Sequence, residues 1–233
     1  MRFSPEAAAL LFINRYFPEC AAAFLAGSTV RGDHTSASDL DIVIIGAEEP
    51  VDRRRCFIKY EWPIEVFLYS KDSFQVFFDS DCMLGIPYLP RMCAEGIILK
   101  DMDGTARKIK VEAKQRLAEG PPPWTQSQTD NARYLITELL DDLEGSEDVA
   151  ENLFTAGQLA DILHEFILRT NRQWTGFGKW TIRSLRRFDE KTAAEFTEAF
   201  QHFYQSGKKE KLTSFTESII EPWGGKLFEG YKS

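Results

Sequence analysis

Two aspartates, Asp39 and Asp41, stand at the start of an apolar run with one residue between them. The run, Leu40–Ile45, is rich in β-branched residues, which favour a strand. Side chains two apart on a strand project from the same face, so the two carboxylates would lie together. Their mutual repulsion is relieved when hard divalent cations such as Mg²⁺ bind between them. The pair therefore predicts a magnesium site at the beginning of this strand.

A third carboxylate is expected from a neighbouring strand. Glu65 lies inside the segment Pro-Ile-Glu-Val-Phe-Leu at 63–68, where a lone charge is costly to bury without a partner. We therefore predict that Glu65 completes the metal site. The alternatives are an exposed position for Glu65 on a half-buried strand, and a solvated strand end or a helix cap for the two aspartates.

A glycine and a serine, Gly27 and Ser28, follow the apolar run 22–25. Such a turn lets backbone amides and a hydroxyl approach phosphate oxygens, and a helix beginning after it would add its positive end. Alone, the dipeptide indicates an ordinary turn. Ahead of the two aspartates, it predicts a binding site for a triphosphate.

The order Gly27-Ser28, Arg31-Gly32 and Asp39-Leu40-Asp41 resembles the signature of the polymerase-beta-like nucleotidyltransferase superfamily, over about the first half of the chain. The resemblance implies a mixed sheet flanked by helices. It also implies transfer of a nucleoside monophosphate, AMP first among the expectations, to a hydroxyl with release of pyrophosphate. Glutamate rather than aspartate at the third metal position departs from the pattern.

The same resemblance assigns roles to single residues. Asp39, Asp41 and Glu65 would be the catalytic residues, holding two Mg²⁺ ions against ATP or another nucleoside triphosphate. Gly27 and Ser28 would hold the outer phosphates. Together with Arg31 and Lys179, they are the expected nucleotide-binding residues.

The run Glu-Gly-Pro-Pro-Pro at 119–123 is the clearest boundary, because consecutive prolines cannot continue a helix. It predicts a nucleotidyltransferase domain over 1–120 and a helical, substrate-binding domain over 121–233, an α+β architecture followed by an all-α bundle. In the first domain the patterns predict helices over 4–17, 71–78 and 106–118, strands over 22–25, 40–45, 55–60, 64–69 and 97–100, and a turn at Glu61-Trp62-Pro63. In the second they predict helices over 130–144, 150–170, 180–187, 191–204 and 208–220.

The second half resembles the substrate-binding domain of aminoglycoside nucleotidyltransferases in its helical pattern. Glu138, Asp141 and Asp142 share the polar face of one helix, and they are either a solvated face or substrate-binding residues that include the general base. Lys179 belongs to a basic cluster with Arg169, Arg172 and Arg183. We expect Lys179 to reach across a cleft between the domains to the triphosphate. The alternatives are a structural loop and a nucleic-acid contact.

The chain is acidic: 28 basic against 36 acidic residues give its 233 residues a net charge of -8. This charge disfavours a nucleic-acid partner bound over a broad surface and favours a small or cationic substrate. The four cysteines lack the spacing of a thiolate metal site or a disulfide framework, which indicates reduced thiols in the cytoplasm. No apolar run is long enough to span a bilayer, so we expect a cytoplasmic protein without a membrane partner.

Three functions remain open at this point. The first is a transferase acting on a small molecule, and the second is a transferase acting on a protein or an RNA end, which predicts a basic surface near the site. The third is a non-catalytic regulatory module with a nucleotide pocket. It predicts a missing carboxylate, whereas all three are present. The sequence leaves open the acceptor, the preferred nucleotide and whether the chain forms a homodimer.

Overall fold

The chain divides into two compact units, Met1–Glu119 and Gly120–Ser233. The computed structural model describes residues 3–32, 35, 37–46 and 53–232. Each unit has its own buried apolar residues, which form one cluster in the second unit and two in the first.

The first unit is built on a five-stranded mixed sheet with the strand order β3-β4-β2-β1-β5. The strands are β1 (Ala22–Ala26), β2 (Leu40–Ile45), β3 (Arg54–Lys59), β4 (Trp62–Tyr69) and β5 (Ile97–Asp101). β2 and β4 are parallel, whereas β1 pairs antiparallel with both β2 and β5, and β3 pairs antiparallel with β4. β3 is therefore an edge strand, next to the strand that carries Glu65.

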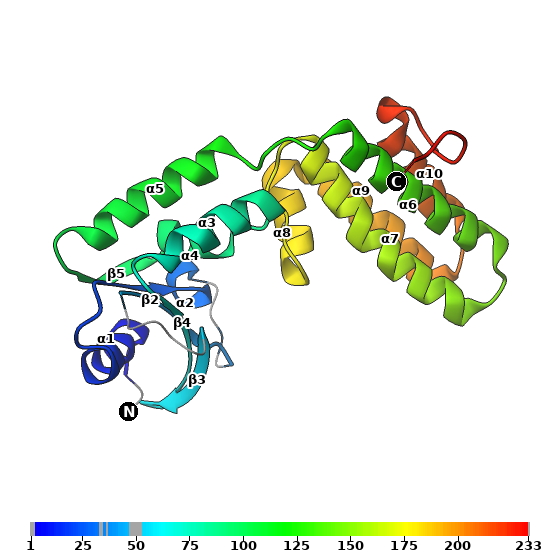
Figure 1. Cartoon of the computed structure of the whole chain (residues 1–233). Helices are drawn as coiled ribbons and strands as arrows, with labels where there is room; N and C mark the ends of the chain where they lie inside the picture. The colour runs from blue at the N-terminus through cyan, green and yellow to red at the C-terminus, as the bar shows by residue number, and fades with distance from the viewer. Residues whose placement is uncertain (1–2, 33–34, 36, 47–52, 233) are drawn as a thin grey trace. The chain divides into compact units, whose positions relative to one another are not determined.

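Helices cover both faces of this sheet (Figure 1). They are α1 (Pro5–Tyr16), α2 (Ser28–Arg31), α3 (Ser73–Leu84), α4 (Tyr88–Glu95) and α5 (Thr105–Glu119). Phe12 and Ile13 of α1 pack on the face formed by Leu40, Ile42 and alternate residues of the neighbouring strands. Residues of α3, α4 and α5 pack on the opposite face, against Val43 and its neighbours. Asp41 belongs to this second face because it alternates with Ile42 along β2.

Two predicted details are wrong, and one helix was not predicted. The turn before β4 is at Tyr60 and Glu61, which have φ of 54° and 62°, and not at residues 61–63. Pro63 is instead inside β4, where it precedes the parallel pairing with β2 that begins at Ile64, so its missing N–H leaves that ladder intact. The helix predicted over 71–78 runs on to Leu84, and α4 after it was not predicted.

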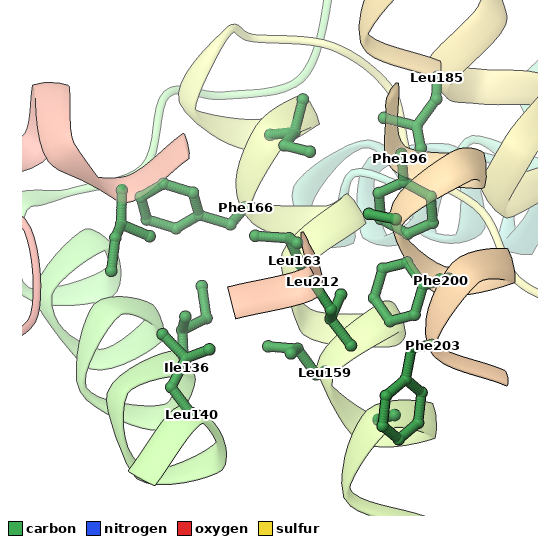
Figure 2. Close-up of a cluster of buried hydrophobic side chains, with 14 of the residues drawn as sticks. Ile136, Leu140, Leu159, Leu163, Phe166, Leu185, Phe196, Phe200, Phe203 and Leu212 are labelled. Atoms are coloured by element: carbon green, nitrogen blue, oxygen red, sulfur yellow. The ribbon is translucent and has the colours of Figure 1, made fainter. Parts of the chain in front are cut away.

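The second unit is helical throughout its described regular structure. Its elements are α6 (Gln126–Gly145), α7 (Val149–Thr170), α8 (Lys179–Phe188), α9 (Glu190–Ser206), α10 (Glu210–Ile220) and the 3-10 helix η1 (Glu221–Trp223). Apolar residues at helical spacing meet in one core (Figure 2), among them Ile136, Leu163, Phe166, Phe200 and Leu212. The predicted combination of a mixed sheet with helices and a largely helical second half is confirmed.

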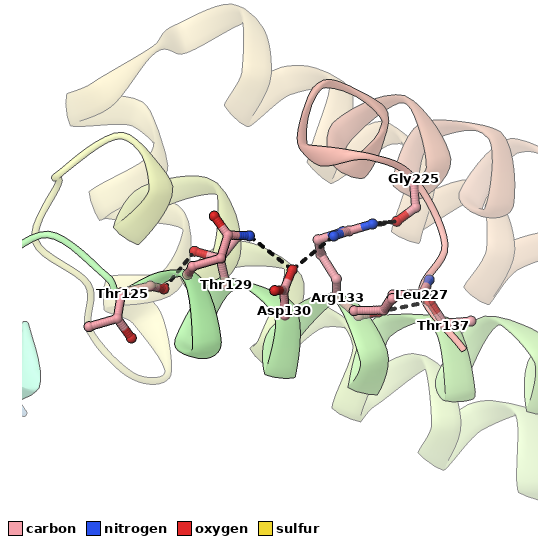
Figure 3. A network of polar contacts seen from close by, with 8 residues as sticks. Thr125, Thr129, Asp130, Arg133, Thr137, Gly225 and Leu227 are labelled. Carbon is pink, nitrogen blue, oxygen red and sulfur yellow. Dashed lines mark hydrogen bonds and ion pairs between the residues drawn. The ribbon is translucent and has the colours of Figure 1, made fainter. Parts of the chain in front are cut away.

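Polar residues of α6 fix the C-terminal segment (Figure 3). The Arg133 guanidinium donates to the Gly225 carbonyl from Nε and Nη2, at 3.1 and 3.0 Å, and pairs with Asp130 at 2.9 Å. The Thr137 hydroxyl accepts from the Leu227 amide at 2.9 Å. These bonds satisfy a guanidinium that is only 8% exposed, and they hold the segment along α6.

Candidate active site

Three carboxylates gather where β2 and β4 begin. Asp41 lies directly opposite Glu65 in the parallel pairing of these strands, and Asp39 immediately precedes β2. One oxygen from each of Asp39, Asp41 and Glu65 lies within 4.8 Å of the others, and all three residues are half-buried. Three hard oxygen donors on one sheet face are a set that Mg²⁺ accepts together with phosphate oxygens and water. The donor set thus fits a divalent metal ion.

The absence of a side chain at Gly27 leaves space for the Asp41 carboxylate. Asp41 is paired with Ala26 of β1, and the next residue, Gly27, leaves the strand with φ of 78° and ψ of -157°, a conformation essentially restricted to glycine. A Cβ atom on Gly27 would lie 1.8 Å from Asp41 Oδ2. Both the backbone conformation and the close approach therefore require glycine here.

The turn after β1 is connected to the residue that precedes Asp39. The Ser28 hydroxyl donates to the Ser38 hydroxyl at 3.2 Å. The helix expected after the Gly-Ser turn is present as α2, but it has only four residues, so its dipole contributes less than a long helix would. Arg31, at the end of α2, forms an ion pair with Glu95 at 3.8 Å. A role for Arg31 in phosphate binding remains a prediction.

Two residues of β3 that the sequence interpretation missed contact Glu65. The Arg54 guanidinium donates to Glu65 Oε1, and the Cys56 thiol lies 3.7 Å from the same oxygen. The bond to Glu65 raises the pKa of Arg54. Arg54 and Cys56 are two residues apart, the same spacing as the two aspartates, but only the register of β3 with β4 reveals that they face Glu65.

The predicted site residues of the second unit have structural partners or exposed positions. Lys179 is exposed at the first position of α8, after Gly178. Arg169, assigned to the same basic cluster, is 4% exposed, donates to the Pro122 carbonyl at 3.1 Å and lies over the Trp124 ring at 5.5 Å. Burial lowers its pKa. Arg169 therefore belongs to the interior of this unit and not to a basic surface.

The acidic residues of α6 lie on the polar face of that helix. Asp141 pairs with Lys226 at 3.1 Å, and Glu138 accepts a hydrogen bond from Tyr134 that raises the tyrosine pKa. Asp142 is exposed. A substrate-binding role for these three residues stays a prediction.

The first unit thus carries a half-buried carboxylate cluster beside a glycine turn, on a mixed sheet between helical layers. Residues 9–94, which lie in the first unit, match the family model described as "Nucleotidyltransferase domain". The predicted resemblance to nucleotidyltransferases is thereby confirmed.

One solved structure shares the fold across most of the chain. It is a nucleotidyltransferase-like protein from Exiguobacterium sibiricum, 10% identical, with a TM-score of 0.52; the match covers 93% of this chain and 74% of that one. At this identity the likeness supports the fold alone. No curated protein sequence matches the chain. The likeness of the second half to aminoglycoside nucleotidyltransferases remains a prediction.

No helix within residues 3–32, 37–46 and 53–232 has both the length and the apolar character needed to cross a bilayer.

All four cysteines are free thiols, and only Cys56 is exposed.

Proposed function

We propose that the protein transfers a nucleoside monophosphate, AMP from ATP in the first instance, to a hydroxyl group of a small molecule and releases pyrophosphate. The observation that carries this proposal is the approach of Asp39, Asp41 and Glu65 to within 4.8 Å inside a nucleotidyltransferase domain. A cationic acceptor suits the net charge of -8.

The chain's own residues have distinct parts in this reaction. Asp39, Asp41 and Glu65 would hold two Mg²⁺ ions, which supply charge stabilisation for the phosphoryl oxygens and the attacking hydroxyl. The backbone at Gly27 and the Ser28 hydroxyl bind the outer phosphates, and Arg31 and Lys179 add positive charge. Glu138, Asp141 and Asp142 are proposed to bind a positively charged part of the acceptor, apart from its reacting hydroxyl.

The transfer itself requires an in-line arrangement. The acceptor oxygen forms a bond to the α-phosphorus, the bridging oxygen leaves with its bonding electron pair as pyrophosphate, and the hydroxyl proton passes to solvent. The residues contribute by placing the reacting atoms and by stabilising the charge that develops on the phosphate.

Isothermal titration with a non-hydrolysable ATP analogue tests this function. The wild-type protein should bind the analogue in the presence of Mg²⁺, and binding should disappear with EDTA. The double variant Asp39→Asn, Asp41→Asn should lose this binding, whereas Asp72→Asn, which changes an exposed carboxylate before α3, should keep it. Equal binding by wild type and double variant, or no binding by either, would contradict the proposal.

A further inference from the structure

A pocket of about 380 Å³ lies beside the carboxylates, within the first unit. Its lining combines charged residues, Asp39, Arg54 and Glu65, with the uncharged Cys56, Ile58 and Pro63. Charged groups next to an apolar surface are typical of sites that recognise a small molecule.

The pocket continues the sheet face that carries the metal-binding carboxylates. Cys56 lies opposite Glu65, and Ile58 lies opposite Pro63, in the antiparallel pairing of β3 with β4. Because paired residues share a face, and Glu65 also lies opposite Asp41, one surface extends from Asp41 across β4 to the edge strand. The metal site and the pocket are therefore contiguous.

Ile58 is the most distinctive residue of this surface, since it is 82% exposed. Its neighbour Phe57 points to the opposite face, where its ring lies 5.2 Å from that of Phe12 in α1. Ile58 and the exposed Pro63 opposite it together form a small apolar surface beside the charged residues, and a ligand that covers this surface gains hydrophobic free energy.

The side from which the acceptor must approach the nucleotide indicates which ligand the pocket binds. Gly27 and Ser28 lie on the β1 side of Asp41, whereas the pocket lies on its other side, along β4 and the edge strand β3. In an in-line displacement the nucleophile enters opposite the leaving pyrophosphate. If the outer phosphates lie at Gly27 and Ser28, then the acceptor enters from the side of the pocket.

We propose that this pocket binds the part of the acceptor that carries the reacting hydroxyl, and that this part is a compact apolar body such as a ring. The inference rests on the proposed function and adds to it the chemical class of the group next to the hydroxyl. Ile58 and Pro63 contact the apolar body, and the hydroxyl lies toward Glu65 and Asp39.

Cys56 allows a direct test, because it is the exposed one of the four cysteines and lies in the pocket. The rate of its alkylation by N-ethylmaleimide is measured alone, with benzyl alcohol, with glycerol at the same concentration, with Mg²⁺ alone, and with Mg²⁺ and the ATP analogue. Benzyl alcohol at twice its dissociation constant should slow alkylation about threefold by simple occupancy. Glycerol should leave the rate unchanged, and the nucleotide analogue with Mg²⁺ should give the same rate as Mg²⁺ alone, because a metal ion at Glu65 would lie next to the Cys56 thiol.

Two variants establish that the apolar surface is responsible. Ile58→Asp should abolish the protection by benzyl alcohol. Val111→Asp, which introduces the same charge at a 66% exposed position of α5, should retain it. Both positions are exposed, so neither substitution should prevent folding.

Each result decides the matter. Protection of Cys56 by the nucleotide analogue beyond that given by Mg²⁺ alone would mean that the pocket binds the nucleoside, and equal effects of benzyl alcohol and glycerol would mean that no apolar body is recognised. Either would overturn the inference while leaving the proposed function standing, provided that titration of the same samples shows magnesium-dependent nucleotide binding. Loss of that binding from the wild type would overturn both.

Discussion

At the scale of single residues, Gly27 offers a sharp test of the metal site. Gly27→Ala places a Cβ against Asp41 Oδ2, so we expect the variant to lose binding of Mn²⁺, used as a probe for Mg²⁺, by about tenfold or more, in addition to about 1–3 kcal/mol of stability from the strained backbone. Titration calorimetry measures the affinity, and thermal unfolding measures the stability.

Gly32 provides the control for this change. It also has a positive φ, 79°, but a Cβ there would have nothing within 4 Å. Gly32→Ala should therefore lose about 1 kcal/mol of stability and keep its metal affinity. Equal loss of metal affinity in the two variants would show that backbone strain, and not the contact with Asp41, is responsible.

For Arg54 we predict a gain in metal affinity rather than a loss. The Arg54 guanidinium donates a hydrogen bond to Glu65 Oε1, the oxygen that a metal ion would also bind. The variant Arg54→Ala should therefore bind Mn²⁺ more tightly. Because Arg54 is 66% exposed, the gain should be only about threefold, under ~1 kcal/mol. Arg55→Ala, which changes the next residue on the opposite face of β3, should leave the affinity unchanged; weaker binding by Arg54→Ala would instead mean that Arg54 holds Glu65 in place.

The residues of the site differ in how far the sequence reveals them. The two aspartates and the Gly-Ser pair are close in the chain, so their spacing alone predicts their proximity. Glu65 is identifiable because a charge interrupts an apolar strand. Arg54 and Cys56 cannot be identified in this way, because their position next to Glu65 depends on how β3 pairs with β4. A tight turn fixes this pairing, and a shift of one residue would move both side chains to the opposite face of the sheet.

At the scale of elements, the caps of helices in the second unit have measurable effects on stability. Asp189 precedes α9 and accepts from the Thr192 amide at 2.6 Å, a bond that lowers the pKa of the carboxyl. A lowered pKa means that the charged form stabilises the folded state above the pKa of the unfolded chain, and that this stabilisation is lost as the pH falls through the lowered value.

Asp189→Asn should therefore be less stable than the wild type at pH 7, and the difference should shrink as the pH falls below the ordinary aspartate range. Melting temperatures measured from pH 7 down to pH 3 show the trend. Asp161→Asn, at an exposed position within α7, should show no comparable trend. A difference that stays constant with pH would contradict the assigned cause.

The long helices could be predicted from the spacing of their apolar residues, whereas a short helix that contains a proline and the position of a turn next to a proline could not. α6 and α7 carry clear apolar spacing over many turns, so their existence was predictable. α4 is short and contains Pro90, which hides its pattern. Pro63 suggested a turn, although a proline at the start of a strand is compatible with pairing.

At the scale of the whole molecule, we predict that Lys179 of the second unit takes part in binding the nucleotide. Lys179→Ala should weaken binding of the ATP analogue about three- to tenfold, the range expected when one charge contact to phosphate is lost. Lys208→Ala, at another exposed lysine of the same unit, should bind as the wild type does. Unchanged binding by Lys179→Ala would limit the nucleotide site to the first unit. The sequence could not decide this, because contacts between units leave no periodic pattern.

The strand order also bears on how the newly made chain acquires its structure. β1 is bonded to β5, which is the last strand to be synthesised, and β2 reaches its parallel partner only after β3 and the turn have been made. Pairings between distant segments form slowly, whereas α6 and α7 are consecutive and pack locally. On a ribosome the slower unit emerges first and so gains time before the faster one appears. The three carboxylates should accordingly come together late in the folding of their own unit, when the central strands join.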